Sequence, residues 1–171
     1  MINIVVTGKR QSGKSTLIKR VIEKYNFSVG GYVTLPVYNN NVISGYKMVS
    51  VPSNGIEKTI IDIKMDGEVI PYPSVFLDFG VNCIENGLNG DYDFLLLDEI
   101  GRIEKNVFQF TDKIKYALDS NKNVFAVLKK EDIHFINEIK KRNDIYLWDI
   151  DIIDRQKAFM EICNFIENLE V

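Results

Sequence analysis

One stretch decides the fold of this chain: Gly8-Lys9-Arg10-Gln11-Ser12-Gly13-Lys14-Ser15. It follows the short apolar run Ile2-Asn3-Ile4-Val5-Val6-Thr7 and opens a segment in which apolar residues recur at helical spacing. A glycine, four free positions and then Gly-Lys-Ser, placed between a strand and a helix, are the pattern of a phosphate-binding loop. The sequence therefore predicts a site for a nucleoside di- or triphosphate together with Mg²⁺.

The loop is expected to hold phosphate through its backbone as well as its side chains. Gly8 and Gly13 allow backbone conformations that a side chain would block, so that successive N–H groups point into one concave anion site. The helix that we expect to begin at Lys14 adds its unpaired N–H groups and the positive end of its dipole. We expect the Lys14 ammonium to contact the β- and γ-phosphates, the Ser15 hydroxyl to bind Mg²⁺ and Thr16 to contact the α-phosphate. The predicted nucleotide contacts are Gly8, Lys9, Arg10, Gln11, Ser12, Gly13, Lys14, Ser15 and Thr16.

A second motif, Phe94-Leu95-Leu96-Leu97-Asp98-Glu99, is an apolar run that ends in two acids. We expect Asp98 to lie at the carboxyl end of a strand neighbouring the first one and to hold Mg²⁺, directly or through water. Glu99 can accept a proton from, or orient, a water that attacks the γ-phosphate. Small-molecule kinases usually need no acid here, because their nucleophile is the acceptor's own oxygen, so Glu99 favours hydrolysis. The alternative interpretation of Glu99 is a solvated acid at the end of a strand.

Three basic residues are further candidates for contact with the γ-phosphate. Arg102 lies just beyond the acid pair and could stabilise transition-state charge as an arginine finger does, or could be a surface residue paired with an acid. Lys129 and Lys130 follow the next predicted strand, where the alternative is a solvated strand end. The residues that we predict to be catalytic are Lys14, Glu99 and Arg102, and the predicted metal ligands are Ser15 and Asp98.

The composition of the chain bounds the classes of function. With 171 residues, 46% of them hydrophobic and 26% charged, the chain fits a single globular domain over residues 1–171. A net charge of −3 gives no support for broad binding to nucleic acid. No apolar run approaches the length of a membrane-spanning helix, and the distant Cys83 and Cys163 indicate thiols in a reducing compartment. We therefore expect a cytoplasmic protein with no membrane segment, and nothing in the sequence names a protein partner.

Strands and helices alternate over most of the chain, which predicts an α/β fold with a mainly parallel sheet and helices on both faces. The expected strands are residues 2–7, 93–97, 124–128 and 145–150, and the expected helices are residues 14–25, 82–88, 105–120, 131–141 and 155–169. Ligands of such sheets bind beyond the carboxyl ends of the strands, which is where the phosphate loop is expected to lie.

Residues 30–70 differ in character and are predicted to be a β-rich insert. Two β-rich runs are separated by Asn39-Asn40-Asn41, and asparagine tolerates the backbone conformations of hairpin turns. A half-buried strand is expected over residues 57–65, followed by a turn at Asp66-Gly67. Pro71 and Pro73 are expected to interrupt regular structure. We expect these antiparallel strands to lie against, or to extend, one edge of the main sheet.

The residues after the acid pair resemble a known family. Asp98-Glu99-Ile100-Gly101-Arg102-Ile103-Glu104 resembles the Asp-Glu-Ile-Gly-Lys-Met-Glu signature of the small P-loop nucleoside-triphosphatases, which have thermophilic members and a human, cancer-related one. Gly30-Gly31-Tyr32-Val33-Thr34 and Ser44-Gly45-Tyr46-Lys47-Met48-Val49 resemble two further segments of that family. The resemblance covers nearly the whole chain, although only the phosphate loop and the Asp-Glu-Ile-Gly run are specific.

The resemblance implies a RecA-like core that hydrolyses nucleoside triphosphates to diphosphate and phosphate, slowly, with Mg²⁺ and with little selectivity among bases. Two departures bear on the contacts to the base. Asp154-Arg155-Gln156 stands where members commonly carry Asn-Arg-Asp, and Phe76 to Val81 stands where they carry a segment like Val-Gly-Lys-Tyr. Arg102 stands in place of the family's lysine.

Two other classes of function use the same loop. A small-molecule or nucleotide kinase would transfer the phosphoryl group to an acceptor, but the acid pair and the lack of an arginine-rich lid argue against it. A nucleotide-dependent regulatory module would bind and signal without turnover, but the intact set of Lys14, Ser15, Asp98 and Glu99 argues against a decayed site. The sequence thus favours a hydrolase of nucleoside triphosphates.

Overall fold

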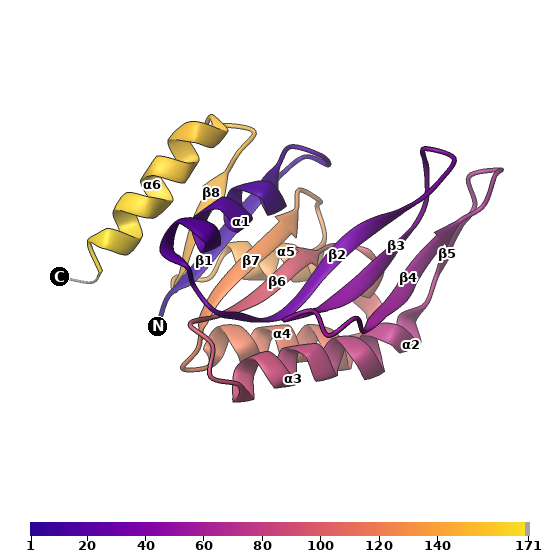
Figure 1. Cartoon of the computed structure of the whole chain (residues 1–171), viewed down its shortest axis with the longest axis horizontal. Helices are drawn as coiled ribbons and strands as arrows, with labels where there is room; N and C mark the ends of the chain where they lie inside the picture. Colours follow the sequence, from indigo (N-terminus) through magenta and orange to yellow (C-terminus); the bar gives the residue numbers. More distant parts are fainter. Residues whose placement is uncertain (170–171) are drawn as a thin grey trace.

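The chain folds around one eight-stranded sheet with the order β5-β4-β3-β2-β6-β7-β1-β8 (Figure 1). The computed structural model describes residues 1–169. Five strands run parallel and form the centre and one side of the sheet. They are β2 (Val29–Asn39), β6 (Phe94–Ile100), β7 (Asn123–Lys129), β1 (Asn3–Gly8) and β8 (Ile145–Asp149). This architecture confirms the predicted mainly parallel α/β sheet.

Three antiparallel strands extend the sheet beyond β2, as the sequence predicted. They are β3 (Val42–Val51), β4 (Glu57–Ile63) and β5 (Val69–Pro71). Strand β2 belongs to both parts, because its residues 29–33 pair in parallel with β6 while its residues 31–39 pair in antiparallel with β3. The far half of β2 and the antiparallel strands therefore project past the end of β6, as the long ribbons in Figure 1 show.

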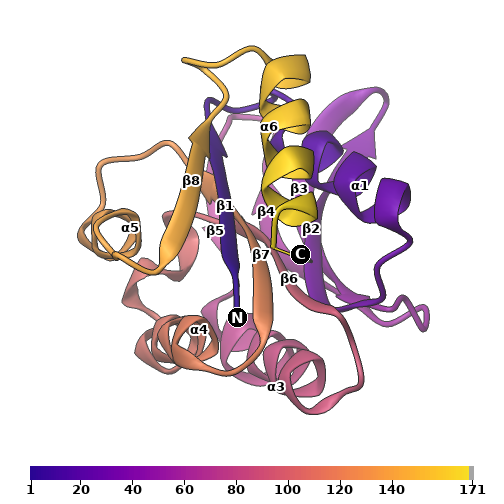
Figure 2. The same cartoon turned by 90° about the vertical axis from the view of Figure 1, so that its left-hand side faces the viewer.

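Helices cover both faces of the sheet because side chains alternate along each central strand. Ile4 and Val6 pack on one face with α1 (Lys14–Tyr25) and α6 (Arg155–Glu167). Val5 packs on the other face, which is covered by α3 (Val81–Asn89), α4 (Phe108–Asp119) and α5 (His134–Lys140). Figure 2 shows the two helical layers on either side of the sheet. None of the helices in the described part of the chain has the length and apolar character that crossing a membrane requires.

Two predicted boundaries were wrong for local reasons. Pro71 ends β5, as predicted, but Pro73 begins a helix: α2 (Pro73–Val75) continues through a π-helical turn over residues 76–80 into α3. Proline suits the first helical position because the N–H that it lacks would be unpaired there. The helix expected at residues 105–120 is divided into a 3₁₀ turn (Ile103–Asn106) and α4, which begins at Phe108.

Candidate active site

The phosphate loop connects β1 to α1, and of the two glycines that we singled out, Gly13 has a positive φ and Gly8 does not. Gln11 and Gly13 have φ of 60° and 92°, and α1 begins at Lys14 directly after Gly13. The two oxygens of the Asp151 carboxylate accept hydrogen bonds from the Lys9 N–H at 3.0 and 3.1 Å. That hydrogen bond is the main reason why the pKa of Asp151 lies below its ordinary value. The loop is thus fastened at its start by an acid that follows β8.

Lys14 is buried at the centre of the site. Its ammonium donates hydrogen bonds to the carbonyl oxygens of Gly8 at 3.0 Å and Lys9 at 2.8 Å. Its Nζ also lies 3.1 Å from Oε1 of Glu99. The two groups that the sequence assigned to phosphate binding and to water activation therefore form an ion pair with each other.

Asp98 lies on the strand that we expected, β6, and against the start of α1, but this strand is not the direct neighbour of β1. We predicted a strand beside β1, but β7 lies between β1 and β6 because strand order is set by long-range pairing. The loop carries the first turn of α1 across the end of β7, and Ser15 Oγ donates a hydrogen bond to Asp98 Oδ1 at 2.9 Å. Asp98 is only 5% exposed. Burial, which the Ser15 hydrogen bond only partly offsets, raises the pKa of its carboxyl to about 7.

Glu99 lies at an irregularity in β6, where the register to β7 shifts between Asp98 and Ile100. Its N–H donates a long hydrogen bond to Thr34 Oγ1 on β2 at 3.4 Å. One carboxylate oxygen faces Lys14, and the other lies 3.8 Å from Nζ of Lys129 at the end of β7. The carboxylate is therefore flanked by two ammonium groups.

The other predicted basic residues point in different directions. Arg102 is 66% exposed, and its Nε lies 3.3 Å from Glu131 Oε1. Lys130 binds two acids on the far side of the loop, Asp149 at 2.8 Å and Asp151 at 3.1 Å. The Arg10 guanidinium donates a hydrogen bond to the Tyr46 hydroxyl on β3.

A cavity of about 760 Å³ lies between the phosphate loop and the ribbon of β2 and β3, and most of the predicted site residues line it. Its charged and polar lining is Lys9, Arg10, Gln11, Lys14, Ser15, Thr16, Glu99, Arg102, Lys129, Lys130 and Glu131, and Pro36, Tyr38, Ile43, Tyr46 and Ile61 form part of its wall. Of the predicted nucleotide contacts, Gly8 and Ser12 are absent from this lining among residues 1–169. A smaller hollow of about 240 Å³ adjoins it beside Gly13, Thr16 and Arg155. The two hollows share Gly13 and Thr16 in their lining, so the loop and the first turn of α1 lie between them.

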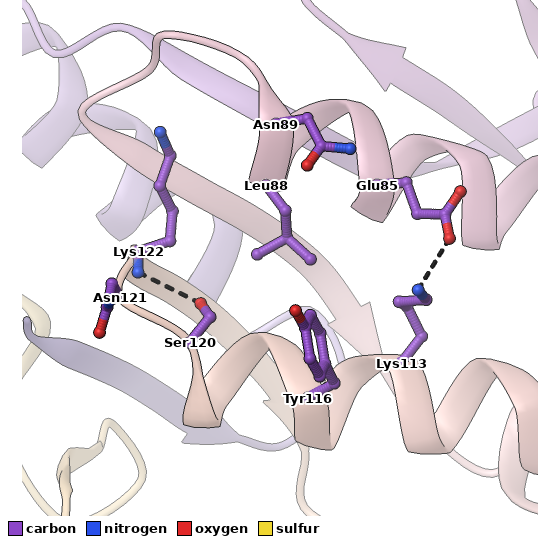
Figure 3. Close-up of a pocket in the computed structure, with 8 residues that line it drawn as sticks. All are labelled: Glu85, Leu88, Asn89, Lys113, Tyr116, Ser120, Asn121 and Lys122. Atoms are coloured by element: carbon purple, nitrogen blue, oxygen red, sulfur yellow. Dashed lines mark hydrogen bonds and ion pairs between the residues drawn. The ribbon is translucent and has the colours of Figure 1, made fainter.

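A third hollow, of about 340 Å³, lies between α3 and α4 (Figure 3), and no predicted site residue lines it. Lys113 and Glu85 form an ion pair at 2.7 Å across its rim. Tyr116 and Leu88 also line this hollow. Its residues therefore serve as reference positions that lie outside the cavity of the phosphate loop.

Three residues that support the site were not predicted from the sequence. Asp151 fastens the loop, Thr34 contacts the Glu99 backbone and Tyr46 binds Arg10. One signal was available for Asp151, because it follows a predicted strand whose carboxyl end must lie at the same edge as the loop. Thr34 and Tyr46 carried no such signal, since their position depends on the pairing of β2 with β6 and of β3 with β2.

Comparisons with known proteins agree with this geometry. A family model described as NTPase matches residues 3–163. The nucleoside-triphosphatase THEP1 of Methanocaldococcus jannaschii is 28% identical over 173 residues, which cover 96% of this chain and 97% of that protein. The crystal structure of THEP1 from Aquifex aeolicus has a TM-score of 0.76 at 22% identity and covers 94% of this chain and 96% of that one.

The solution structure of a human cancer-related nucleoside triphosphatase has the same fold. Its TM-score is 0.75 at 17% identity, and the match covers 98% of each chain. The family model spans nearly all of the sequence, from the first strand to the last helix. On that match, and with the full-length fold in agreement, the chain belongs to the NTPase family of enzymes that hydrolyse nucleoside triphosphates.

Proposed function

We propose that this enzyme hydrolyses nucleoside triphosphates to diphosphates and phosphate with Mg²⁺, that it accepts several bases, and that Lys14, Ser15, Asp98 and Glu99 carry the reaction. One observation carries the proposal: these four side chains, from two separate motifs, meet in one cluster joined by contacts of 2.9 and 3.1 Å. Family membership supports the reaction type. Cys83 and Cys163 are buried free thiols, which suits a reducing compartment such as the cytoplasm.

The residues present fit a magnesium ion. Mg²⁺ prefers oxygen ligands and is bound by one or two protein groups together with phosphate oxygens and water. Ser15 Oγ and Asp98 Oδ1 offer a hydroxyl and a carboxylate 2.9 Å apart at the start of α1. Residues 1–169 contain no cluster of three or more acidic, histidine or cysteine side chains that would form a protein-only metal cage. A bound Mg²⁺ would neutralise charge on the β- and γ-phosphates.

The contacts of Lys14 support an exchange of partners when the triphosphate enters. The phosphate oxygens would take the place of the loop carbonyls and of Glu99 as acceptors for the Lys14 ammonium. The Glu99 carboxylate would then be released to accept a proton from a water that faces the γ-phosphate. The negative charge of the bound phosphates would then face the backbone N–H groups of the loop.

Phosphate release tests the proposal. We expect wild-type enzyme with Mg²⁺ to release phosphate from ATP, GTP, CTP and UTP, and we expect Glu99→Gln to bind ATP but to lose at least about 100-fold of its turnover, as loss of a general base does. Glu85→Gln, on α3, is the matched control because it makes the same change in the ion pair with Lys113. Full turnover in Glu99→Gln would remove Glu99 from the mechanism, and no phosphate release from any of the four nucleotides would overturn the proposed function.

A further inference from the structure

We propose that Lys129 is a catalytic residue that places its ammonium on the γ-phosphate during hydrolysis, and that Gly101 and Glu104 position it there. This inference rests on the proposed function, because it assigns a second cation to the same reaction. Lys129 thereby takes the role that the sequence suggested for Arg102, the stabilisation of transition-state charge on the γ-phosphate.

Lys129 lies between the phosphate loop and the acid pair in the sheet. It ends β7, the strand between β1, which carries the phosphate loop, and β6, which carries the acid pair. Its Nζ lies 3.8 Å from one oxygen of Glu99, whose other oxygen lies 3.1 Å from Nζ of Lys14. Two ammonium groups thus converge on one carboxylate, in the space that faces the γ-phosphate end of a nucleotide held by the loop. Both lysines line the 760 Å³ cavity.

The turn after β6 holds the aliphatic stem of Lys129 in place. A Cβ added to Gly101 would lie 2.7 Å from Cδ of Lys129 and 3.3 Å from its Cε and Nζ, so the lysine stem packs directly on the glycine backbone. The N–H of Gly101 in turn donates a hydrogen bond to the buried carboxylate of Glu104. Glu104 therefore fixes the turn after β6, and the glycine in that turn leaves room for the lysine.

Three other cations that line the cavity, Arg10, Arg102 and Lys130, are directed to partners within the protein. Arg102 is 66% exposed and turned towards Glu131, whereas Lys129 is 33% exposed. Lys130 binds Asp149 and Asp151, and Arg10 binds Tyr46. Within the described part of the chain, the Lys129 ammonium makes no hydrogen bond, and its one ion pair, with Glu99, is 3.8 Å long. Lys129 is thus a cation held in place by its stem while its charge is available to a ligand.

The charge has a defined use in hydrolysis. Negative charge spreads over the γ-phosphate oxygens in the transition state, and a positioned cation stabilises it. A lysine that acts there lowers the barrier more than it improves substrate binding. Loss of Lys129 should therefore lower kcat while the affinity for the diphosphate product stays nearly the same.

The test compares Lys129→Met, Lys129→Arg, Gly101→Ala and the double variant Lys129→Met/Gly101→Ala with wild type. Lys113→Met is the control, because it removes one lysine from the hollow between α3 and α4 (Figure 3). We expect Lys129→Met to lower kcat by about 100- to 1,000-fold, the cost of one transition-state donor. We expect KM to change by less than about threefold, since the lost contact belongs to the transition state. Lys129→Arg should recover part of the loss, and Lys113→Met should keep wild-type turnover.

Gly101→Ala shows whether Gly101 acts by positioning Lys129 or whether its substitution disturbs the site in general. It should lower kcat in the wild-type background and have little further effect when Lys129 is already methionine, because the glycine acts through the lysine. Calorimetric titration gives a second readout: Lys129→Met should bind Mg-ADP as wild type does but lose affinity for Mg-ADP with aluminium fluoride, which mimics the transferring phosphate. Wild-type kcat in Lys129→Met, or equal additive losses for glycine and lysine, would overturn the inference. A wild type that releases no phosphate would instead overturn the proposed function.

Discussion

Asp98→Asn should stabilise the nucleotide-free protein while it abolishes hydrolysis, and the size of the effect should depend on pH. Asp98 is 5% exposed, and burial raises the pKa of its carboxyl from 3.8 to about 7. The folded state therefore holds a proton that the unfolded chain has already lost, so this group's contribution to stability is complete below pH 3.8 and is lost as pH rises towards 7. The physical cause is the ionisation of a buried carboxyl whose loss of solvation the Ser15 hydrogen bond only partly offsets.

The magnitude follows from the same two values. At about 1.4 kcal/mol for each pH unit between 3.8 and about 7, the loss is about 1.5 kcal/mol at pH 5 and about 4 kcal/mol at pH 8. Asparagine carries no charge at either pH, and its side-chain oxygen can still accept the hydrogen bond from Ser15. Between pH 5 and pH 8, the wild type should thus lose about 2.5 kcal/mol of stability relative to Asp98→Asn.

Urea unfolding with a chelator and without nucleotide measures this difference. Both proteins are unfolded at pH 5 and at pH 8, and the change in the free energy of unfolding is compared between them, so that every other titrating group cancels. Mg²⁺-dependent phosphate release is measured in parallel and should fall to background in Asp98→Asn. An identical pH dependence of stability in the two proteins would refute the reasoning, because it would mean that the Asp98 charge costs nothing in the folded state.

Two further predictions concern single side chains of the site and the core. Lys14→Ala should weaken Mg-ADP binding by about 100-fold, because two charge-assisted hydrogen bonds to the phosphates are lost, whereas Lys19→Ala on the exposed side of α1 should bind as wild type does. Calorimetric titration measures both affinities, and an unchanged affinity in Lys14→Ala would contradict the role of Lys14 in phosphate binding. Tyr32→Phe should keep or raise the free energy of unfolding by up to about 1 kcal/mol, because the buried Tyr32 hydroxyl has no hydrogen-bond partner among residues 1–169; a loss of more than about 1 kcal/mol in urea unfolding would show that this hydroxyl is satisfied.

The phosphate loop could be predicted from sequence because its chemistry is local. Gly13 needs a positive φ, Lys14 begins the helix and Ser15 follows on its first turn, so eight consecutive residues contain the whole phosphate-binding loop. The acid pair could be predicted for the same reason, since Asp98 and Glu99 end one strand. Their meeting with Ser15 and Lys14 depends on the fold, but the rule that ligands bind at the carboxyl ends of parallel strands anticipates it.

The direction of the basic side chains could not be predicted from spacing. Lys129 directly follows the predicted strand 124–128, and Arg102 lies five residues beyond the predicted strand 93–97. Neither spacing shows which of them faces Glu99, because that depends on the turn at Gly101, which Glu104 holds. Strand order failed as a prediction for a similar reason: the placement of β7 between β1 and β6 is set by pairing between residues far apart in the chain. Both features depend on contacts that no local pattern contains.

The pairing of Glu99 with Lys14 and Lys129 links substrate binding to the activation of water. In the nucleotide-free site the two ammonium groups flank the carboxylate at 3.1 and 3.8 Å, so its oxygens face cations. On the proposed mechanism both ammonium groups move to the γ-phosphate when the triphosphate binds. Glu99 then loses its cationic neighbours, so its carboxylate is free to accept a proton from water only when a substrate is present. Because the switch is operated by the γ-phosphate, it needs no contact to the base, and it would work equally with any nucleoside triphosphate that the loop can hold.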